Sequence, residues 1–290
     1  MKYREIYELG VTRLKEAGIK EAELDARLLL EYVCHTDRNT LLAHPEHPVT
    51  EEEIDSYVNY LAEREKRVPL QHIVGYQEFM GLELYVNQHV LIPRQDTENL
   101  VEEVMPHVHD GMKILDLCTG SGCILISLLQ YSNDCIGVGT DISKEALEVA
   151  AKNGEAILKE KEGKVYEQLR FVESDLFSNL PHEKFDLIVS NPPYIKTSVI
   201  DTLEPEVASF EPHLALDGGR DGLDFYRRIA KEAGSFLIRG GMLFLEIGYD
   251  QGEAVAGLLK EAGFVDIEIR KDYGGLDRVV FGTFLEECHV

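Results

Sequence analysis

The sequence predicts an α/β fold, in which a doubly wound, mainly parallel β-sheet with an antiparallel edge strand follows a small all-helical domain. Three observations lead to this prediction. Residues 1 to about 70 show only the helical spacing of apolar residues. From residue 113 onward, short apolar runs alternate with helical patterns, as they do in βαβ units. The chain closes with a helix and two strands, an order that places an antiparallel strand at the edge of a mixed sheet.

The 290 residues are enough for two domains, each with its own core. We expect a helical domain over residues 1–73, a β-hairpin linker over 74–92 and the α/β domain over 93–290. The helical domain could dock a substrate protein or only shield the α/β domain, and its apolar pattern fits both interpretations equally.

Three helices are expected in the first domain. The first stops at Gly18, the second covers the region around Leu24 to Val33, and the third begins at a capping box formed by Thr50 and Glu53. Pro69 ends the third helix. The residues expected to face inward are Ile6, Leu9, Leu14, Ala17, Leu24, Leu28, Leu29, Tyr32, Val33, Ile54, Tyr57, Val58 and Leu61.

The period changes to two between residues 74 and 92, where Leu82, Leu84 and Val86 alternate with other residues. Because Gly75 and Gly81 punctuate this stretch, we expect a short hairpin. A helix follows from residue 93 toward 108. The strands expected beyond it are 113–117, 135–140, 169–173, 185–190, 242–247, 265–270 and 278–284. The helices expected between them are 124–130, 144–161, 223–237 and 253–262.

The charge of the chain is strongly negative. Lys and Arg total 29 against 53 Asp and Glu, which gives a formal net charge of −24. Such a field repels phosphate backbones, so we expect a protein or small-molecule substrate and no direct nucleic-acid partner. A basic protein partner would be attracted.

The cysteines and the hydropathy of the chain indicate the cellular compartment in which the protein is expected to occur. The five cysteines are odd in number and form no Cys-x-x-Cys pair, so we expect neither a disulfide framework nor a metal site. No run approaches the ~18 apolar residues of a membrane span, and residues 1–5 lack the apolar centre of a signal peptide. We therefore expect a cytoplasmic protein without membrane association.

The most informative motif is Asn191-Pro192-Pro193-Tyr194, which directly follows the apolar run 185–190. The Asn191 side-chain oxygen and the Pro192 carbonyl are acceptors for an NH₂ group, and the prolines fix φ and remove donors. The ring of Tyr194 offers a face for a planar group. Alternatively, Asn-Pro-Pro is an ordinary way to end a strand in a turn.

A glycine-containing loop follows the strand 113–117. Cys118, Thr119, Gly120, Ser121 and Gly122 lead into a helix, whose first N–H groups can approach a ligand. A dinucleotide site would need Gly-x-Gly-x-x-Gly, and this loop has only Gly-x-Gly. Asp116 just before it would repel phosphate, but a carboxylate suits a cationic amine such as that of S-adenosylmethionine.

Acidic residues also end the next two strands. Asp141 lies where a carboxylate would accept both ribose hydroxyls of an adenosine group. Asp175 could accept the adenine amine, with Leu176 and Phe177 flanking the ring. Each aspartate alone could simply cap a helix. Three at successive strand ends predict S-adenosylmethionine as the cofactor and S-adenosylhomocysteine as the product.

These motifs, together with the segment Ile92-Pro93-Arg94 to Glu98, resemble the protein-(glutamine-N5) methyltransferases of peptide chain release factors, the PrmC/HemK family. The resemblance extends over essentially the whole chain, through residues 210–216, 224–226 and 272–279. It implies a class I methyltransferase that methylates the glutamine of the Gly-Gly-Gln motif in release factors, in translation termination. The Asn-Pro-Pro-Tyr motif also occurs in DNA adenine methyltransferases.

The resemblance implies cofactor contacts at residues 118–122, Asp141 and Leu176. It implies glutamine binding at Asn191, Pro192, Pro193 and Tyr194, with Asn191 also near the cofactor, and we expect Asn191, Pro192 and Tyr194 to act in catalysis. Two departures stand out, because the family often has glycine at Cys118 and usually proline at Gln95. The alternatives are an N-methyltransferase of nucleic-acid bases, methylation of a ribosomal-protein glutamine, and a non-enzymatic adaptor. The pattern leaves open whether Arg94, Asp96 and Glu98 cap a helix or line a pocket.

Overall fold

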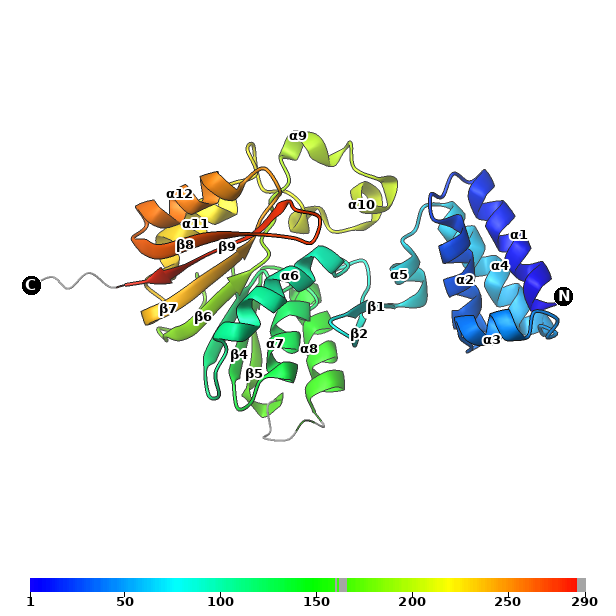
Figure 1. The fold of residues 1–290 in the computed structure, drawn as a ribbon, viewed down its shortest axis with the longest axis horizontal. Coiled ribbons are helices and arrows are strands. Elements are labelled where there is room, and N and C mark those ends of the chain that lie inside the picture. Colours follow the sequence, from blue (N-terminus) through cyan, green and yellow to red (C-terminus); the bar gives the residue numbers. More distant parts are fainter. Residues whose placement is uncertain (160, 162–165, 286–290) are drawn as a thin grey trace, which may run out of the picture. The chain divides into compact units, whose positions relative to one another are not determined.

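The computed structural model describes residues 1–159, 161 and 166–285 (Figure 1). It divides into two compact units, the first formed by residues 1–76 with 204–210 and the second by 77–203 with 211–290. The domain boundaries after residues 73 and 92 stay predictions. The sequence pattern did not indicate that residues 204–210 would belong to the same unit as the helices of residues 1–76.

The first unit is helical, as expected. The capping box of Thr50 and Glu53 is present at the start of the third long helix. Leu24 was expected to face inward and is 39% exposed, because the buried face of its helix runs instead through Ala22, Ala26, Leu29 and Leu30. The helices are α1 (Tyr3–Glu16), α2 (Ala22–Val33), α3 (Arg38–Ala43), α4 (Glu51–Glu65), α5 (Leu70–Val74) and α10 (Pro205–Phe210).

A buried arginine connects α10 to the other helices of this unit. The Nε of Arg64 in α4 lies 2.8 Å from Oδ2 of Asp25 in α2, and its Nη2 lies 2.9 Å from Oε1 of Glu206 in α10. Arg67 also pairs with Glu206, at 2.8 Å. Both side chains of the Arg64–Asp25 pair are more than nine-tenths buried, so losing either partner would leave an uncompensated charge.

The second unit contains a seven-stranded sheet with the strand order β5-β4-β3-β6-β7-β9-β8. Adjacent strands from β5 through β7 pair in parallel, and β9 is antiparallel to both neighbours. The predicted fold class is confirmed. The antiparallel strand, however, lies one position inside the edge, because β8 occupies the edge and β9 folds back between β8 and β7. The strands are β3 (Lys113–Leu117), β4 (Ile136–Asp141), β5 (Leu169–Glu173), β6 (Phe185–Ser190), β7 (Leu237–Glu246), β8 (Phe264–Lys271) and β9 (Asp277–Phe284).

Helices cover both faces of this sheet (Figure 1). On β3, Ile114 packs with α6 and α7 on one face, whereas Leu115 and Leu117 belong to the core under α11 and α12 on the other. The helices are α6 (Gln95–Val104), α7 (Cys123–Tyr131), α8 (Lys144–Leu158), α9 (Thr197–Ile200), α11 (Asp224–Ala233) and α12 (Gly252–Glu261), with 3-10 turns at Met105–His107 and His213–Ala215.

A hairpin of β1 (Tyr76–Phe79) and β2 (Leu82–Tyr85) precedes the sheet. Its Phe79 and Leu84 are buried in the core cluster that also contains α6 and α7. The hairpin thus anchors the segment that leads into α6.

The strand order determines where a ligand can bind. From β3 the chain first builds outward through β4 and β5, and then returns to place β6 on the other side of β3. The carboxyl ends of β3 and β6 therefore diverge at a topological switch point, where open α/β sheets bind ligands. Among the described residues, no helix combines the length and the apolar character needed to cross a membrane.

Candidate functional site

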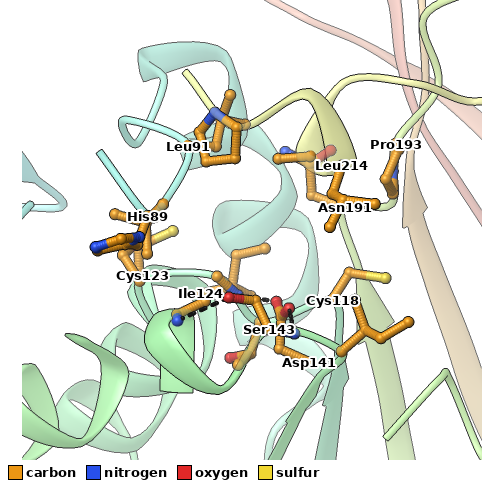
Figure 2. A pocket seen from close by; sticks show the side chains of 18 of the residues that line it. His89, Leu91, Cys118, Cys123, Ile124, Asp141, Ser143, Asn191, Pro193 and Leu214 are labelled. Carbon is orange, nitrogen blue, oxygen red and sulfur yellow. Dashed lines mark hydrogen bonds between the residues drawn. The ribbon is translucent and has the colours of Figure 1, made fainter. Parts of the chain in front are cut away.

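A cavity of about 440 Å³ lies at this switch point, with all of its lining residues in the second unit. Its volume falls in the range of small-molecule sites. Figure 2 shows Cys118, Asp141 and Asn191 on its walls, at the ends of β3, β4 and β6. Of the predicted site residues, those that line it are Cys118, Thr119, Gly120, Ser121, Asp141, Asp175, Leu176, Asn191 and Pro193. Those that do not are Asp116, Gly122, Pro192 and Tyr194.

The loop between β3 and α7 turns through left-handed backbone. Gly120 and Gly122 have φ values of 55° and 81°, and Cys118 has 57°. A side chain disfavours this conformation, so the glycine that the resemblance implies at the position of Cys118 would fit this backbone without strain. A Cβ on Gly120 would meet no atom within 4 Å, so the loop borders open space there. A Cβ on Gly122 would lie 2.7 Å from Cδ1 of Ile126, so this glycine permits close packing beneath the loop.

Asp116 lies behind the loop and is fully buried. Its Oδ2 accepts a hydrogen bond of 2.6 Å from the hydroxyl of Thr119, which does line the cavity. Burial raises the pKa of Asp116 to about 7, against the opposing effect of the Thr119 hydrogen bond. In this structure Asp116 orients a lining residue. Its direct contact with a cofactor amine stays a prediction.

Asp141 is held by two backbone amides. Its Oδ2 accepts from Gly120 N and its Oδ1 from Ser143 N, both at 2.9 Å. Burial raises the pKa of this carboxyl above its ordinary value, and the two amides act in the opposite direction. Each oxygen keeps a further lone pair, so a fixed carboxylate with spare acceptor capacity faces the cavity.

Asp175 and Leu176 form the wall beyond β5. Asp175 pairs with Arg228 of α11 at 2.9 Å, and both residues line the cavity. Leu176 lines it with a left-handed φ of 51°. Phe177, expected to flank an adenine ring, instead stacks on Phe236 in the core at a centroid distance of 4.7 Å. That expectation was wrong, because the chain turns at Leu176 and buries the next side chain.

The Asn-Pro-Pro-Tyr motif follows β6 directly. Asn191 and Pro193 line the same cavity as the β3–α7 loop. Pro192 is buried outside the lining. The Tyr194 hydroxyl donates to Oε1 of Glu246 at 3.4 Å, and the ring packs against the core. The motif is therefore divided, with its first and third side chains toward the cavity.

Residues 216–222 hold the motif in place. Ile195 N donates to the carbonyl of Leu216 at 3.0 Å, and Gly218 N donates to the carbonyl of Ile195 at 2.8 Å. A Cβ on Gly218 would lie 2.7 Å from Cα of Tyr194. Only glycine allows the two backbone segments to approach this closely.

Three charged residues at the start of α6, Arg94 just before it and Asp96 and Glu98 in its first turn, have roles that the sequence left open, and the structure gives each a different partner. Arg94 lines the cavity and pairs with the buried Glu211 at 2.5 Å. Asp96 pairs with Arg278 at 3.1 Å, and Glu98 accepts from the backbone N of Met80 at 2.6 Å. Only Arg94 therefore contributes to the cavity wall.

Sequence reasoning missed two residues behind Asn191. Thr97 lines the cavity and accepts a hydrogen bond of 3.2 Å from Nδ2 of Asn191. Glu246, at the end of β7, is buried beside Tyr194, and burial raises the pKa of its carboxyl to about 7. Glu246 follows the same strand-end rule that selected Asp141, so extending that rule to β7 could have found it.

Comparison with known proteins covers nearly the whole chain. Residues 5–75 match the family of the PrmC N-terminal domain, and residues 95–208 match the Methyltransferase small domain. A "Release factor glutamine methyltransferase" from Caulobacter vibrioides is 42% identical over 273 residues, which cover 93% of this chain and 92% of the relative. One from Clostridium acetobutylicum is 39% identical over 98% of this chain and 99% of its own length.

Solved structures support the fold. A methyltransferase from Pyrococcus furiosus superposes with a TM-score of 0.52 at 16% identity, covering 72% of this chain and 91% of its own. At this identity the likeness shows a shared fold only.

Proposed function

Because this chain belongs to the family of release factor glutamine methyltransferases, we propose that it methylates the side-chain nitrogen of the glutamine in the Gly-Gly-Gln motif of peptide chain release factors. One observation supports the proposal most directly. Asn191 and Pro193, from the motif assigned to the substrate amide, line the same cavity as the glycine loop and Asp141, assigned to the cofactor. A methyl donor and an amide could therefore meet in one enclosed space.

Members of this family use S-adenosylmethionine, and the cavity residues fit it. Asp141 would accept the ribose hydroxyls with the lone pairs that its two backbone amides leave free. The open space at Gly120 allows a ligand to approach the loop closely. Leu176 offers apolar surface to the adenine, and Asp175 would accept its amine while paired with Arg228. When bound, the cofactor supplies an electrophilic methyl carbon on a sulfonium.

The residues of the chain must activate a poor nucleophile. An amide nitrogen is unreactive because its lone pair is delocalised into the carbonyl. The Asn191 Oδ1 would accept one N–H group and aim the nitrogen at the methyl carbon. We assign the second N–H group to the Pro192 carbonyl, although Pro192 does not line the cavity in this structure. These acceptors strengthen as positive charge develops on nitrogen, so they stabilise the transition state more than the ground state. Orientation supplies several further kcal/mol of the barrier reduction.

No side chain needs to remove the proton before transfer, because the N–H becomes acidic as the methyl bond forms. Tyr194 does not line the cavity: its ring packs against the core and its hydroxyl donates to Glu246, so we assign it to holding the motif in place behind Asn191 and Pro193. We assign the helical unit to substrate docking, and the reaction to the cytoplasm, where release factors act.

A labelling experiment tests the proposal. Labelled S-adenosylmethionine should label a purified release factor, and a release factor whose Gly-Gly-Gln glutamine is replaced by alanine should stay unlabelled. DNA, ribosomal RNA and ribosomal protein are incubated in parallel. Label on nucleic acid alone would assign the cavity to base methylation, and label on ribosomal protein alone would replace the release factor as substrate.

A further inference from the structure

Thr97 lies between the Asn191 side chain and a buried carboxyl outside the Asn-Pro-Pro-Tyr motif, that of Glu246. Nδ2 of Asn191 donates to Oγ1 of Thr97 at 3.2 Å. Thr97 lies in the first turn of α6, and its hydroxyl is near enough to the carboxyl of Glu246, at the end of β7, to oppose the rise in the pKa of that carboxyl. Tyr194 donates to Oε1 of the same carboxyl at 3.4 Å. Thr97 is 2% exposed and Glu246 1%, so both side chains are buried.

The chemistry of Asn191, Thr97 and Glu246 determines which group donates a hydrogen bond and which accepts it. A hydroxyl has one proton to donate, and an ionised carboxylate can only accept. Oε2 of Glu246 makes no well-aligned hydrogen bond within the described part of the chain, so it has room for the Thr97 proton. Above about pH 7, where Glu246 is ionised, Thr97 can donate to its Oε2, and the Thr97 oxygen is then left to accept from Asn191. The nitrogen of the Asn191 amide must then face Thr97, and its oxygen must face the cavity.

We propose that Thr97 and Glu246 are positioning residues, which hold the Asn191 amide with its oxygen toward the substrate. This inference rests on the proposed function, because it deepens the role given there to Asn191. The two ends of an asparagine amide have nearly the same shape, so packing alone does not choose between them. In the reversed orientation Asn191 would present N–H donors to the substrate N–H groups, which cannot then be bound.

The size of the effect has a lower and an upper bound. If the two orientations became equally populated, turnover would fall by about twofold. Removing the side chain altogether should cost ~100-fold. Thr97→Val leaves the Asn191 nitrogen without an acceptor and so favours the reversed orientation; at a ratio of about nine to one, kcat falls about tenfold, which is the loss that we expect. The affinity for S-adenosylhomocysteine should change less than threefold.

The test is a double-mutant cycle on the full chain, with kcat and KM measured on release factor and S-adenosylhomocysteine affinity measured by calorimetry. Thr97→Ser keeps the hydroxyl and should restore most of the turnover that Thr97→Val loses. In an Asn191→Ala background, Thr97→Val should have almost no further effect, because it acts through Asn191. An equal loss with and without Asn191 would overturn the inference.

Glu246→Gln provides a second route if Thr97→Val fails to fold. Its amide can donate to Thr97, so it should lower kcat severalfold in the wild-type background and hardly at all beside Asn191→Ala. Full turnover of Glu246→Gln would also overturn the inference. Unimpaired turnover of Asn191→Ala would instead refute the proposed role of Asn191, so the two failures are distinguishable.

Discussion

Replacing Asp141 by asparagine tests the assignment of the cofactor side of the cavity. The native carboxylate accepts two backbone N–H groups, from Gly120 and Ser143, at 2.9 Å each. Asparagine keeps one acceptor oxygen but turns an NH₂ group toward the second N–H. One charge-assisted hydrogen bond is therefore lost, and the remaining oxygen is shared between the backbone and the ribose.

A hydrogen bond to a charged group contributes about 1.5–3 kcal/mol. If the hydrogen bond that is lost is the one to the ribose of the ligand, the affinity for S-adenosylhomocysteine becomes roughly 10- to 100-fold weaker. The effect on folding should be smaller, because burial already raises the pKa of Asp141 and the neutral side chain avoids the cost of burying a charge. We expect the free energy of unfolding to change by less than about 1 kcal/mol.

Calorimetry with S-adenosylhomocysteine and urea unfolding measure the two quantities separately. Glu173→Gln is the matched control, because Glu173 ends the neighbouring strand in register with Asp141 but is exposed and does not line the cavity. A dissociation constant of Asp141→Asn within threefold of the wild type would refute the reasoning. So would an equal loss in the Glu173→Gln control.

Three further predictions concern the substrate side. Asn191→Ala should lower kcat ~100-fold or more, because it removes an acceptor whose hydrogen bond strengthens in the transition state, and the affinity for the cofactor should change less. Unchanged turnover in the labelling assay would show that Asn191 has no role in catalysis. Gly218→Ala should lower kcat at least ~10-fold, because its Cβ would lie 2.7 Å from Cα of Tyr194 and displace the motif, whereas Gly257→Ala, which meets no atom within 4 Å, should not; equal activities of the two variants would contradict this. Burial raises the pKa of Glu246 to about 7 from 4.5, so its stabilising contribution is complete below pH 4.5 and is lost as the pH rises through 7. Urea unfolding should therefore show Glu246→Gln gaining up to about 3 kcal/mol on the wild type between pH 5 and pH 8, and a constant difference would exclude the shift.

Local patterns were sufficient to predict most of the fold. The alternation of apolar runs and helical patterns identified the parallel strands, because both faces of β3 are buried under helices. The capping box at Thr50 marked a helix start correctly. The sequence did not show that β9 lies between β7 and β8 instead of at the edge of the sheet. The alternation of its residues would be the same in either position, so only the strand pairing decides between them.

The site was predictable where it depends on strand ends and less so elsewhere. Asp141 and Asn191 line the cavity because Asp141 is the last residue of β4 and Asn191 directly follows β6, at the carboxyl ends of parallel strands. Asp116 lies one residue before the end of β3, and its carboxyl accepts from Thr119 instead of lining the cavity. The spacing of residues in the sequence does not show this difference. The hydrogen bond between Thr97 and Asn191 joins residues 94 positions apart, so only the folded chain reveals it.

The first unit is built from two separate stretches of the chain, and this limits how the protein can be recombined with a relative. The backbone passes between the two units three times, since residues 204–210 return to helices formed by the first 76 residues. In a chimera that takes only residues 1–76 from a relative, the native Glu206 would face the relative's residues at the positions of Arg64 and Arg67, which pair with Glu206 in this protein. Transplanting α10 together with the N-terminal helices keeps Asp25, Arg64 and Glu206 from a single parent. The first unit is thus inherited as two separate stretches of sequence, and recombination points are best placed on both sides of α10.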